Sequence, residues 1–346
     1  MTVHIALDAM GSDLGADELV AGAVLAVREA DLEVTILGNQ DQVENALAGH
    51  SHPENIHFVP TSQVISMEES PFVAVRKKKD SSIVVAFDLL KQARVDAVVS
   101  AGNSGAVMAA AMRYLGRIKG IARPGIASVF PTLKGPVVMM DVGANVDCRP
   151  QHLYQFAIMA SVFASVTLGI VKPRIGLLSI GEEGGKGNSL VRKTHQLLKE
   201  SSLNFIGNVE GRDTFQGNVD IIVCDGFVGN VCLKLSEGLA EAILTMLKEE
   251  ISKTFKAKMG YLLARQAFVD FRKRVDYAEY GGAPLLGLNG TAVICHGRSS
   301  SLAIKNGIFV AAALIDNNAN ERIRVLLDDV HQDLDGGKPA AVGAGQ

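Results

Sequence analysis

The sequence has no tryptophan, and aromatic residues make up only 5% of its 346 residues. It also carries little net charge, with a formal value of −3 at pH 7. A protein that binds nucleic acid generally needs a basic surface, which displaces the counterions of the phosphates. We therefore exclude general nucleic-acid binding and expect any positive patch to be local.

Cysteine is scarce and has no spacing typical of a bound metal. The four cysteines form no CxxC pair and no Cys/His pattern of the kind that holds zinc. We interpret them as buried free thiols. The first residues show a strand pattern. They do not show the three parts of a standard export signal, which are a charged leader, an apolar stretch and a cleavage site, so we do not expect export by such a signal.

Long apolar runs are also missing, and only one segment is a candidate for a membrane span. Residues 153–171 carry no charge over a length that could cross a bilayer. Four polar residues interrupt this segment, and it lies within a regular alternation of strand and helix patterns. We therefore predict a helix of the core or of a subunit interface, not a membrane span.

What the sequence does contain is a regular alternation of short apolar runs and longer helical patterns. The predicted strands are Ile5–Leu7, Val34–Leu37, Ile56–Val59, Ala97–Val99, Val137–Met140, Ile175–Leu178, Ile221–Val223 and Val293–Ile294. The predicted helices between them include Asp17–Glu29, Ser81–Arg94, Ser104–Leu115, Ser189–Glu200 and Val231–Glu250. This order predicts an α/β fold with three layers, in which helices cover both faces of a mostly parallel sheet. We expect one domain over residues 1–334 and a disordered tail over residues 335–346.

Six predicted strands end in a polar residue that is followed at once by glycine-rich sequence. These loops are Asp8–Asp13, Ser100–Ala106, Asp141–Asn145, Ser179–Asn188, Asp225–Asn230 and His296–Ser300. Since the carboxyl ends of parallel strands lie at one edge of a sheet, we expect the six loops to gather there. Glycine lets backbone N–H groups approach a ligand, and helix N-termini favour anions, so this edge suits an anionic ligand.

Three alternatives remain open for these loops. Asparagine and serine at strand ends also cap helices, so each of Asn103, Asn145, Asn188 and Asn230 could serve only its own helix. The carboxylates of the loops could hold a divalent ion. Ser104, Asp225 and His296 follow the chain order of the α/β-hydrolase triad, and Ser104 lies near a GxSxG-like pattern, which allows a serine hydrolase or thioesterase. No P-loop and no GxGxxG fingerprint is present, which disfavours nucleotide binding.

Residues 253–274 differ in character from the rest of the chain. They hold seven basic residues against one acid, Asp270, and their apolar residues recur at helical spacing. We predict a basic amphipathic helical hairpin over residues 251–276, of a kind that rests on anionic membranes or acidic partners. A solvated helix packed on the body is the alternative. The residues expected to make this contact are Lys256, Met259, Leu262, Leu263, Arg265, Arg272 and Lys273.

The motifs DAMGSD, SAGNSGA, DVGAN, GEEGGKGN, DGFVGN and YGGAPLLGL, in this order, resemble those of the bacterial phosphate acyltransferase family. The resemblance covers residues 5–330, with Ser12 and Ser104 where glycine and threonine are usual. It implies a fold like that of phosphotransacetylases and isocitrate-dehydrogenase-like enzymes, and a homodimer without a metal or another cofactor. It also implies transfer of a long-chain acyl group from acyl carrier protein to inorganic phosphate for phospholipid synthesis.

The resemblance further implies a cytoplasmic enzyme at the inner face of the cell membrane, with a membrane glycerol-3-phosphate acyltransferase downstream. For this chemistry we expect Asn103, Ser104, Asn145 and Lys186 to bind phosphate and the oxyanion. Asp225 and Asn230 would orient groups or relay a proton, and His296 would assist the leaving group. The remaining expected substrate-binding residues are Asp8, Gly11, Gly105, Gly187 and Asn188.

Overall fold

The computed structural model describes residues 2–50, 53–275 and 280–336, and its centre is one sheet of eleven strands. The sheet order is β3-β2-β1-β4-β11-β10-β5-β6-β9-β7-β8. The strands are β1 (Val3–Asp8), β2 (Leu32–Gly38), β3 (Ile56–Pro60), β4 (Ala97–Ser100), β5 (Gly125–Phe130), β6 (Val137–Met140), β7 (Ile175–Leu178), β8 (Phe205–Val209), β9 (Ile221–Val223), β10 (Ala283–Leu286) and β11 (Thr291–Ile294). All eight predicted strands are present, and β5, β8 and β10 are additional.

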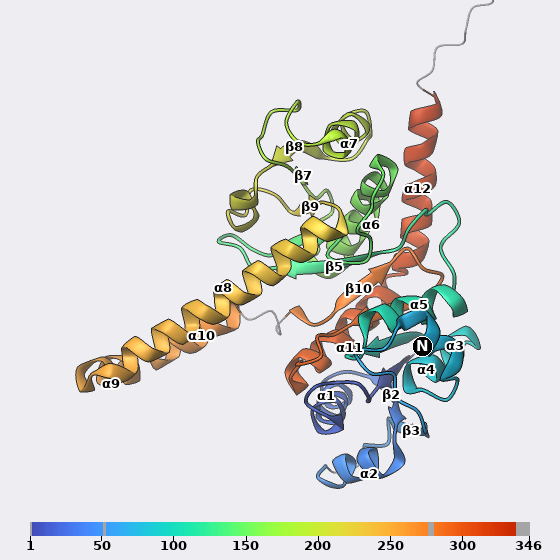
Figure 1. Ribbon diagram of the computed structural model, residues 1–346, viewed down its shortest axis with the longest axis vertical. Coiled ribbons are helices and arrows are strands. Elements are labelled where there is room, and N and C mark those ends of the chain that lie inside the picture. Colours follow the sequence, from blue (N-terminus) through green and yellow to red (C-terminus); the bar gives the residue numbers. More distant parts are fainter. Residues whose placement is uncertain (1, 51–52, 276–279, 337–346) are drawn as a thin grey trace, which may run out of the picture.

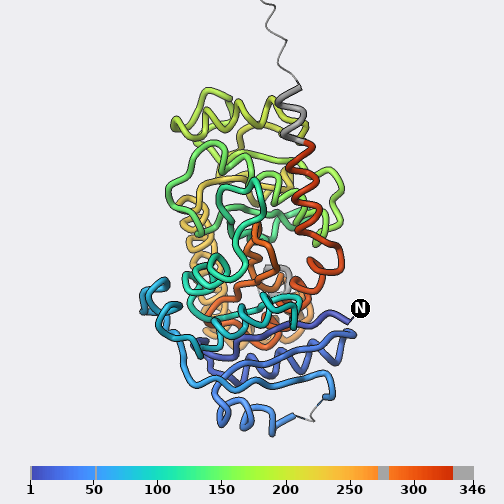
Figure 2. Tube along the Cα trace, turned by 90° about the vertical axis from the view of Figure 1, so that its right-hand side faces the viewer, coloured from blue at the N-terminus to red at the C-terminus, as the bar shows by residue number. Residues whose placement is uncertain are grey.

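The sheet consists of two parallel parts that run in opposite directions. Strands β3, β2, β1, β4 and β11 are parallel to one another, as are β6, β9, β7 and β8. Between them, β10 is antiparallel to β11, β5 is antiparallel to β10, and β6 is antiparallel to β5. Figures 1 and 2 show the two parts as a blue and orange lower half and a green and yellow upper half. The prediction of a mostly parallel sheet is confirmed.

Helices cover both faces of the sheet, which gives the three predicted layers. They are α1 (Ala16–Glu29), α2 (Gln40–Ala48), α3 (Pro71–Lys77), α4 (Ser82–Lys91), α5 (Ser104–Tyr114), α6 (Pro150–Leu168), α7 (Ser189–Lys199), α8 (Gly226–Lys253), α9 (Phe255–Leu263), α10 (Arg265–Val275), α11 (Ser301–Asp316) and α12 (Ala319–Gly336), with a short 3-10 helix at Gly211–Phe215. Since side chains alternate along a strand, Ile5 and Leu7 of β1 pack with α1 and α11, whereas Ala6 packs with α4 and α5 on the other face.

The uncharged segment 153–171 forms most of α6, and the prediction of a core helix is confirmed. Every residue from Leu153 to Ala164 is buried, and α6 packs against β6, β9 and α12. Ser161 and Thr167 donate their hydroxyls to backbone carbonyls one turn earlier, so their polar groups need no water. Among the described residues, no helix is both long and apolar enough to cross a membrane.

An exposed helical arm leaves the sheet at α8 (Figure 1). Helix α8 has 28 residues, a length of about 42 Å, and only Gly226 and Gly229 at its start are buried. Helix α9 lies at the far end, and α10 runs back. Residues 251–276 were predicted as a separate hairpin, but the arm includes most of α8 as well; residue 276 lies outside the described residues.

The C-terminal helix α12 rises from the lower half beside α6 in both views (Figures 1 and 2). It continues through Gly336, two residues beyond the predicted end of the domain. The rest of the predicted disordered tail, residues 337–346, lies outside the described residues. All four cysteines are free thiols, of which Cys224 and Cys295 are buried.

Candidate functional site

The six glycine-rich loops form two sets of three, and the expectation of one shared edge is wrong. Loops Asp8–Asp13, Ser100–Ala106 and His296–Ser300 follow the neighbouring strands β1, β4 and β11. Loops Asp141–Asn145, Asp225–Asn230 and Ser179–Asn188 follow the neighbouring strands β6, β9 and β7. Because the antiparallel strands β10 and β5 reverse the strand direction between the sets, their carboxyl ends emerge at opposite edges of the sheet.

Asp8 is the buried centre of the first set. Its carboxylate accepts the N–H of Met10 at 3.0 Å and the hydroxyl of Ser100 at 2.6 Å. The Ser100 hydroxyl in turn accepts the N–H of Gly102 at 3.1 Å, so Asp8 holds two loops together. Burial raises the pKa of Asp8 to about 6, although these hydrogen bonds oppose the rise.

This raised pKa makes a prediction about stability. Asp8 has a higher pKa in the folded protein than the ordinary value of 3.8, so the folded protein binds more protons and the free energy of unfolding falls as the pH rises toward 6. Relative to Asp8→Asn, we expect the unmodified protein to lose about 1.4 kcal/mol between about pH 5 and pH 7.5. Urea unfolding at both pH values measures this difference. A difference that does not change with pH would contradict the assignment.

The other predicted residues of the first set have mainly structural contacts. Asn103 caps α5 by accepting the N–H of Ala106, and its amide donates to the carbonyls of Ser66 and Met67. Ser104 begins α5 and is exposed. A side chain at Gly105 would meet Pro71 at 2.7 Å, which explains a glycine there. His296 accepts the N–H of Arg298 at Nδ1, which leaves Nε2 for the proton.

Two further contacts join the loops of the first set. The hydroxyl of Ser12 and the N–H of Asp13 both donate to the carbonyl of Gly297, at 2.9 and 2.8 Å. Gly11 adopts a φ of 82°, and a side chain there would approach the backbone of Gly102 at 3.3 Å. Serine at position 12 therefore takes part in the loop packing.

Asp141 organises the second set. It is fully buried, and its two oxygens accept the backbone N–H groups of Ile126, Gly143, Ala144 and Asn145 at 2.8–3.2 Å. Burial raises the pKa of Asp141, and these hydrogen bonds act in the opposite direction. The Asn145 amide donates to Asp141 and to the carbonyl of Pro124, so it positions the loop.

The loop after β9 lies directly against this network. Gly226 donates its N–H to the carbonyl of Asn145 at 2.8 Å, and Asp225 caps α8 by accepting the N–H of Val228. Asn230 is exposed on the first turns of α8. A Cβ atom added at Gly143 would lie 3.6 Å from the Asn230 side chain, so the two residues are neighbours. Asp225 and Asn230 therefore belong to the same site as the Asp141 loop.

The loop after β7 is the most exposed of the six. Lys186 is exposed and, among the described residues, forms no ion pair. Gly187 has a φ of 93°, and Asn188 caps α7 by accepting the N–H of Val191. The hydroxyl of Ser179, beneath Gly187, is buried and has no hydrogen-bond partner within the part of the chain that the structure describes. Lys186 is thus an available cation in the loop after β7, the strand next to β9.

Directly after the Asp141 loop lies a cavity of about 460 Å³ that the sequence interpretation missed. It is lined by Arg123, Asp147, Cys148, Arg149 and His152. Arg149 is the N-cap residue of α6, where the helix dipole adds positive potential. Neither arginine forms an ion pair with any residue in the described part of the chain. The lining thus holds two arginines against one acid, Asp147, so the cavity has the net positive charge and the donors that an anion such as phosphate requires.

The titratable groups of the cavity agree with this description. Burial, Arg123 and Arg149 together lower the pKa of His152. His152 accepts the Arg149 N–H at Nδ1, so its neutral ring carries the proton on Nε2 and can donate. Burial raises the pKa of the Cys148 thiol to about 11, which excludes it as a thiolate nucleophile near neutral pH.

Comparison with known proteins gives a consistent result. A family model described as a fatty acid synthesis protein matches residues 3–322. A phosphate acyltransferase from Geotalea uraniireducens is 55% identical, over 94% of this chain and 95% of its own length. The chain belongs to the phosphate acyltransferase family. A second phosphate acyltransferase, from Geobacter sulfurreducens, is 53% identical over 93% of both chains.

Membership of the phosphate acyltransferase family makes this protein an acyltransferase, as the loop motifs implied. Its fold is similar to the crystal structure of a phosphotransacetylase from Streptococcus pyogenes, with a TM-score of 0.61 and 19% identity over 91% of this chain and 94% of the other. The expected phosphotransacetylase-like fold is therefore confirmed.

The serine-hydrolase alternative does not fit the sheet. Ser104 follows β4 and His296 follows the neighbouring strand β11, but Asp225 follows β9, four strands beyond β11. At about 4.8 Å per strand, Asp225 starts about 19 Å from His296 across the sheet, and at the opposite edge. A Ser–His–Asp triad requires hydrogen-bond contact between its members. In a member of the phosphate acyltransferase family, Ser104 therefore has no triad to activate it.

Proposed function

We propose that this enzyme transfers a long-chain acyl group from the thioester of acyl carrier protein to inorganic phosphate, giving acyl phosphate for phospholipid synthesis. The observation that carries the proposal is the cavity with Arg123, Arg149 and His152 beside the Asp141 loop. Two arginines that form no ion pair within the described part of the chain suit a dianionic substrate, and each can bind it through two parallel hydrogen bonds.

The chemistry needs positioning more than activation. A phosphate oxygen attacks the thioester carbonyl carbon, the carbon–sulfur bond breaks, and the phosphopantetheine sulfur leaves as a thiolate that takes up a proton. Phosphate is anionic near neutral pH, and the thiol has a pKa of about 8.5, so no serine nucleophile is needed. In our proposal Lys186 and Asn230 stabilise the oxyanion, Asp225 orients them, and Asn145 and Asn103 hold the loops.

One assay tests this function. The protein is incubated with palmitoyl-acyl carrier protein, with and without phosphate, and acyl phosphate is trapped with hydroxylamine. Hydroxylamine also cleaves the thioester directly, so the rate without enzyme is subtracted. We expect hydroxamate above this background only when phosphate is present, and equal rates for Ser104→Ala and the unmodified protein within about threefold. Loss of thioester without phosphate, or labelling of Ser104 by a fluorophosphonate, would instead support the hydrolase.

The arm supplies support for the proposed contact with a membrane and with carrier protein. Phe255, Leu262 and Leu263 at its far end are 78%, 60% and 85% exposed, and Met259 is 42% exposed. Lys256 and Arg265 are exposed beside them, and Arg272 and Lys273 lie in α10. We propose that this end rests on the inner face of the membrane, where a glycerol-3-phosphate acyltransferase takes up the product.

A flotation experiment tests the membrane contact. We expect the unmodified protein to float with vesicles that contain about 30% anionic lipid, and the double variant Leu262→Glu, Leu263→Glu to lose at least about 90% of this binding, because two apolar contacts become charges that anionic lipid repels. Val171→Glu is the control, since Val171 is 90% exposed but lies far from the arm in sequence. Unchanged flotation of the double variant would reject the contact.

A homodimer belongs to the same proposal. Val231, Leu235 and Leu239 recur every four residues along α8 and are 49–72% exposed, so they form an apolar stripe along the arm. Pairing of two arms would cover it. Light scattering after gel filtration measures the mass, and a monomer at micromolar concentration would contradict the dimer.

A further inference from the structure

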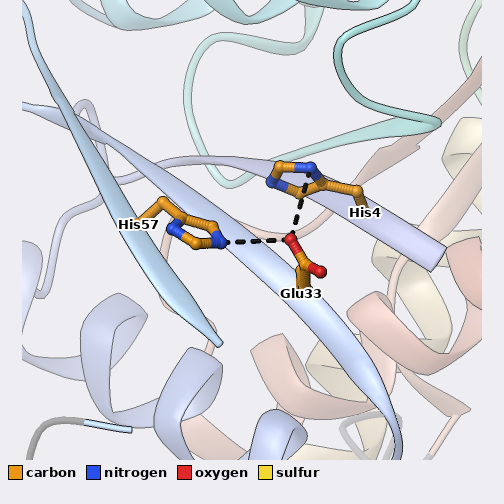
Figure 3. A group of neighbouring side chains, drawn as sticks. All are labelled: His4, Glu33 and His57. Atoms are coloured by element: carbon orange, nitrogen blue, oxygen red, sulfur yellow. Dashed lines mark hydrogen bonds and ion pairs between the residues drawn. The ribbon is translucent and has the colours of Figure 1, made fainter. Parts of the chain in front are cut away.

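Two histidines and a glutamate meet at the edge of the sheet, away from the glycine-rich loops (Figure 3). His4 lies near the start of β1, Glu33 near the start of β2, and His57 near the start of β3, the edge strand. His4 pairs in register with Glu33, and His57 pairs with Thr35, two residues after Glu33. Because side chains two residues apart share a face, all of them project from the same face of the sheet.

The separations between the three side chains suit a single metal ion. Glu33 Oε2 lies 3.1 Å from His57 Nε2 and 3.8 Å from His4 Nδ1, and one ligand atom from each residue lies within 4.8 Å of the other two. Around tetrahedral zinc, with bonds of about 2.0–2.1 Å, ligand atoms lie about 3.3 Å apart. The observed distances therefore need only small side-chain adjustments. The side chains are 25%, 39% and 47% exposed for His4, Glu33 and His57, so an ion can enter.

A neighbouring hydroxyl orients one histidine. His4 Nε2 lies 2.7 Å from the Thr35 hydroxyl, which is buried. The nitrogen on the other side of the ring, Nδ1, lies 3.8 Å from the Glu33 carboxylate. When the Nε2 proton is donated to Thr35, the lone pair on Nδ1 is available to a metal ion beside that carboxylate.

The surrounding charges permit a cation. Asp96 accepts the backbone N–H of His4 at 2.8 Å, and Glu33 and Asp96 both act on His4 as negative charges. Arg94 acts in the opposite direction. The charges of Glu33, Asp96 and Arg94 sum to −1, which favours a divalent ion over an anion.

We propose that His4, Glu33 and His57 bind one divalent transition-metal ion of the zinc class, with water as the fourth ligand. The donor set of two imidazoles and one carboxylate is typical of zinc. Since each ligand comes from a different strand, the ion joins the edge strand β3 to β2 and β1. Thr35 is a positioning residue that orients His4. Because the site lies at the amino ends of the strands, the ion takes no part in the proposed acyl transfer.

Equilibrium dialysis of the full-length protein against zinc, with the metal measured by mass spectrometry, tests the site. We expect one zinc per chain at micromolar free zinc. Glu33→Gln and His57→Gln should weaken binding at least about 100-fold, and Thr35→Val about 10-fold. Cobalt should give the intense visible absorption of a four-coordinate site in the unmodified protein and lose it in His57→Gln.

His50→Gln and Glu54→Gln are the matched controls, because they make the same chemical changes nearby but outside the three-residue cluster. Each variant is also unfolded with urea in EDTA, where His57→Gln should match the unmodified protein because its side chain is half exposed. With zinc added, only proteins that retain the site should become more stable. No bound zinc at about 100 μM, or equal binding by His57→Gln and the unmodified protein, would overturn the proposal.

Discussion

Replacing Arg149 with glutamine should lower kcat/KM for phosphate by about 10²–10³-fold. The guanidinium lines the cavity from the N-cap residue of α6, where it makes no capping hydrogen bond, and in the described residues it has no acidic partner whose loss would disturb the fold. Its removal therefore acts on the substrate and leaves the folded state almost unchanged. Arg149→Lys keeps the charge but not the paired hydrogen bonds, so we expect an intermediate loss of about 10-fold.

The hydroxylamine assay at varied phosphate concentration measures this effect. Most of the change should appear in KM for phosphate, and KM for the acyl thioester should change little. Arg94→Gln is the control, because it removes an equal charge from the turn before β4, away from the cavity. If Arg149→Gln and Arg94→Gln have the same activity, the cavity does not bind the reacting phosphate.

Replacing Gly229 with alanine should destabilise the protein by about 3 kcal/mol or more. A methyl group at this position would overlap the carbonyl oxygen of Asp141, and it would also press on the thiol of Cys224 at 2.9 Å. The Asp141 carbonyl belongs to the backbone, and the hydrogen bonds of the Asp141 side chain hold that backbone in place. The start of α8 would have to shift away from the loop, and activity would fall with stability.

Gly238→Ala is the matched control within the same helix. Nothing lies within 4 Å of a methyl group there, and the residue is exposed. Alanine is the better helix former, so this change should stabilise α8 by up to about 1 kcal/mol. Urea unfolding measures both variants. Equal stability of the two variants would show that α8 does not pack on the Asp141 loop as described.

The order of strands and helices could be predicted because each apolar run was long enough to be recognised alone. The three missed strands lack such a run. β8 contains Gly207, which has a φ of 110°, and the register shifts where β8 pairs with β7. β10 contains Pro284 and follows residues that are rich in glycine. β5 begins with Gly125 after a proline and alternates apolar with small residues.

The missed strands explain the error about the site. β10 and β5 are the antiparallel strands that reverse the sheet, and strand direction depends on pairing that no local pattern encodes. Without them the six loops were placed at one edge. The capping asparagines were identified as candidate ligands because a cap and a ligand have the same local sequence. Arg123, Arg149 and His152 belong to no motif, and His4, Glu33 and His57 meet only through strand register.

The five hydrogen bonds that Asp141 accepts have a consequence for how substrate is bound. Its loop is already ordered before any ligand arrives, so binding does not spend conformational entropy on that backbone. Calorimetric titration with phosphate should therefore show a small change in heat capacity and no large entropic penalty. Recognition beside this ordered loop would follow a lock-and-key model, whereas any closure would come from the exposed Lys186 loop.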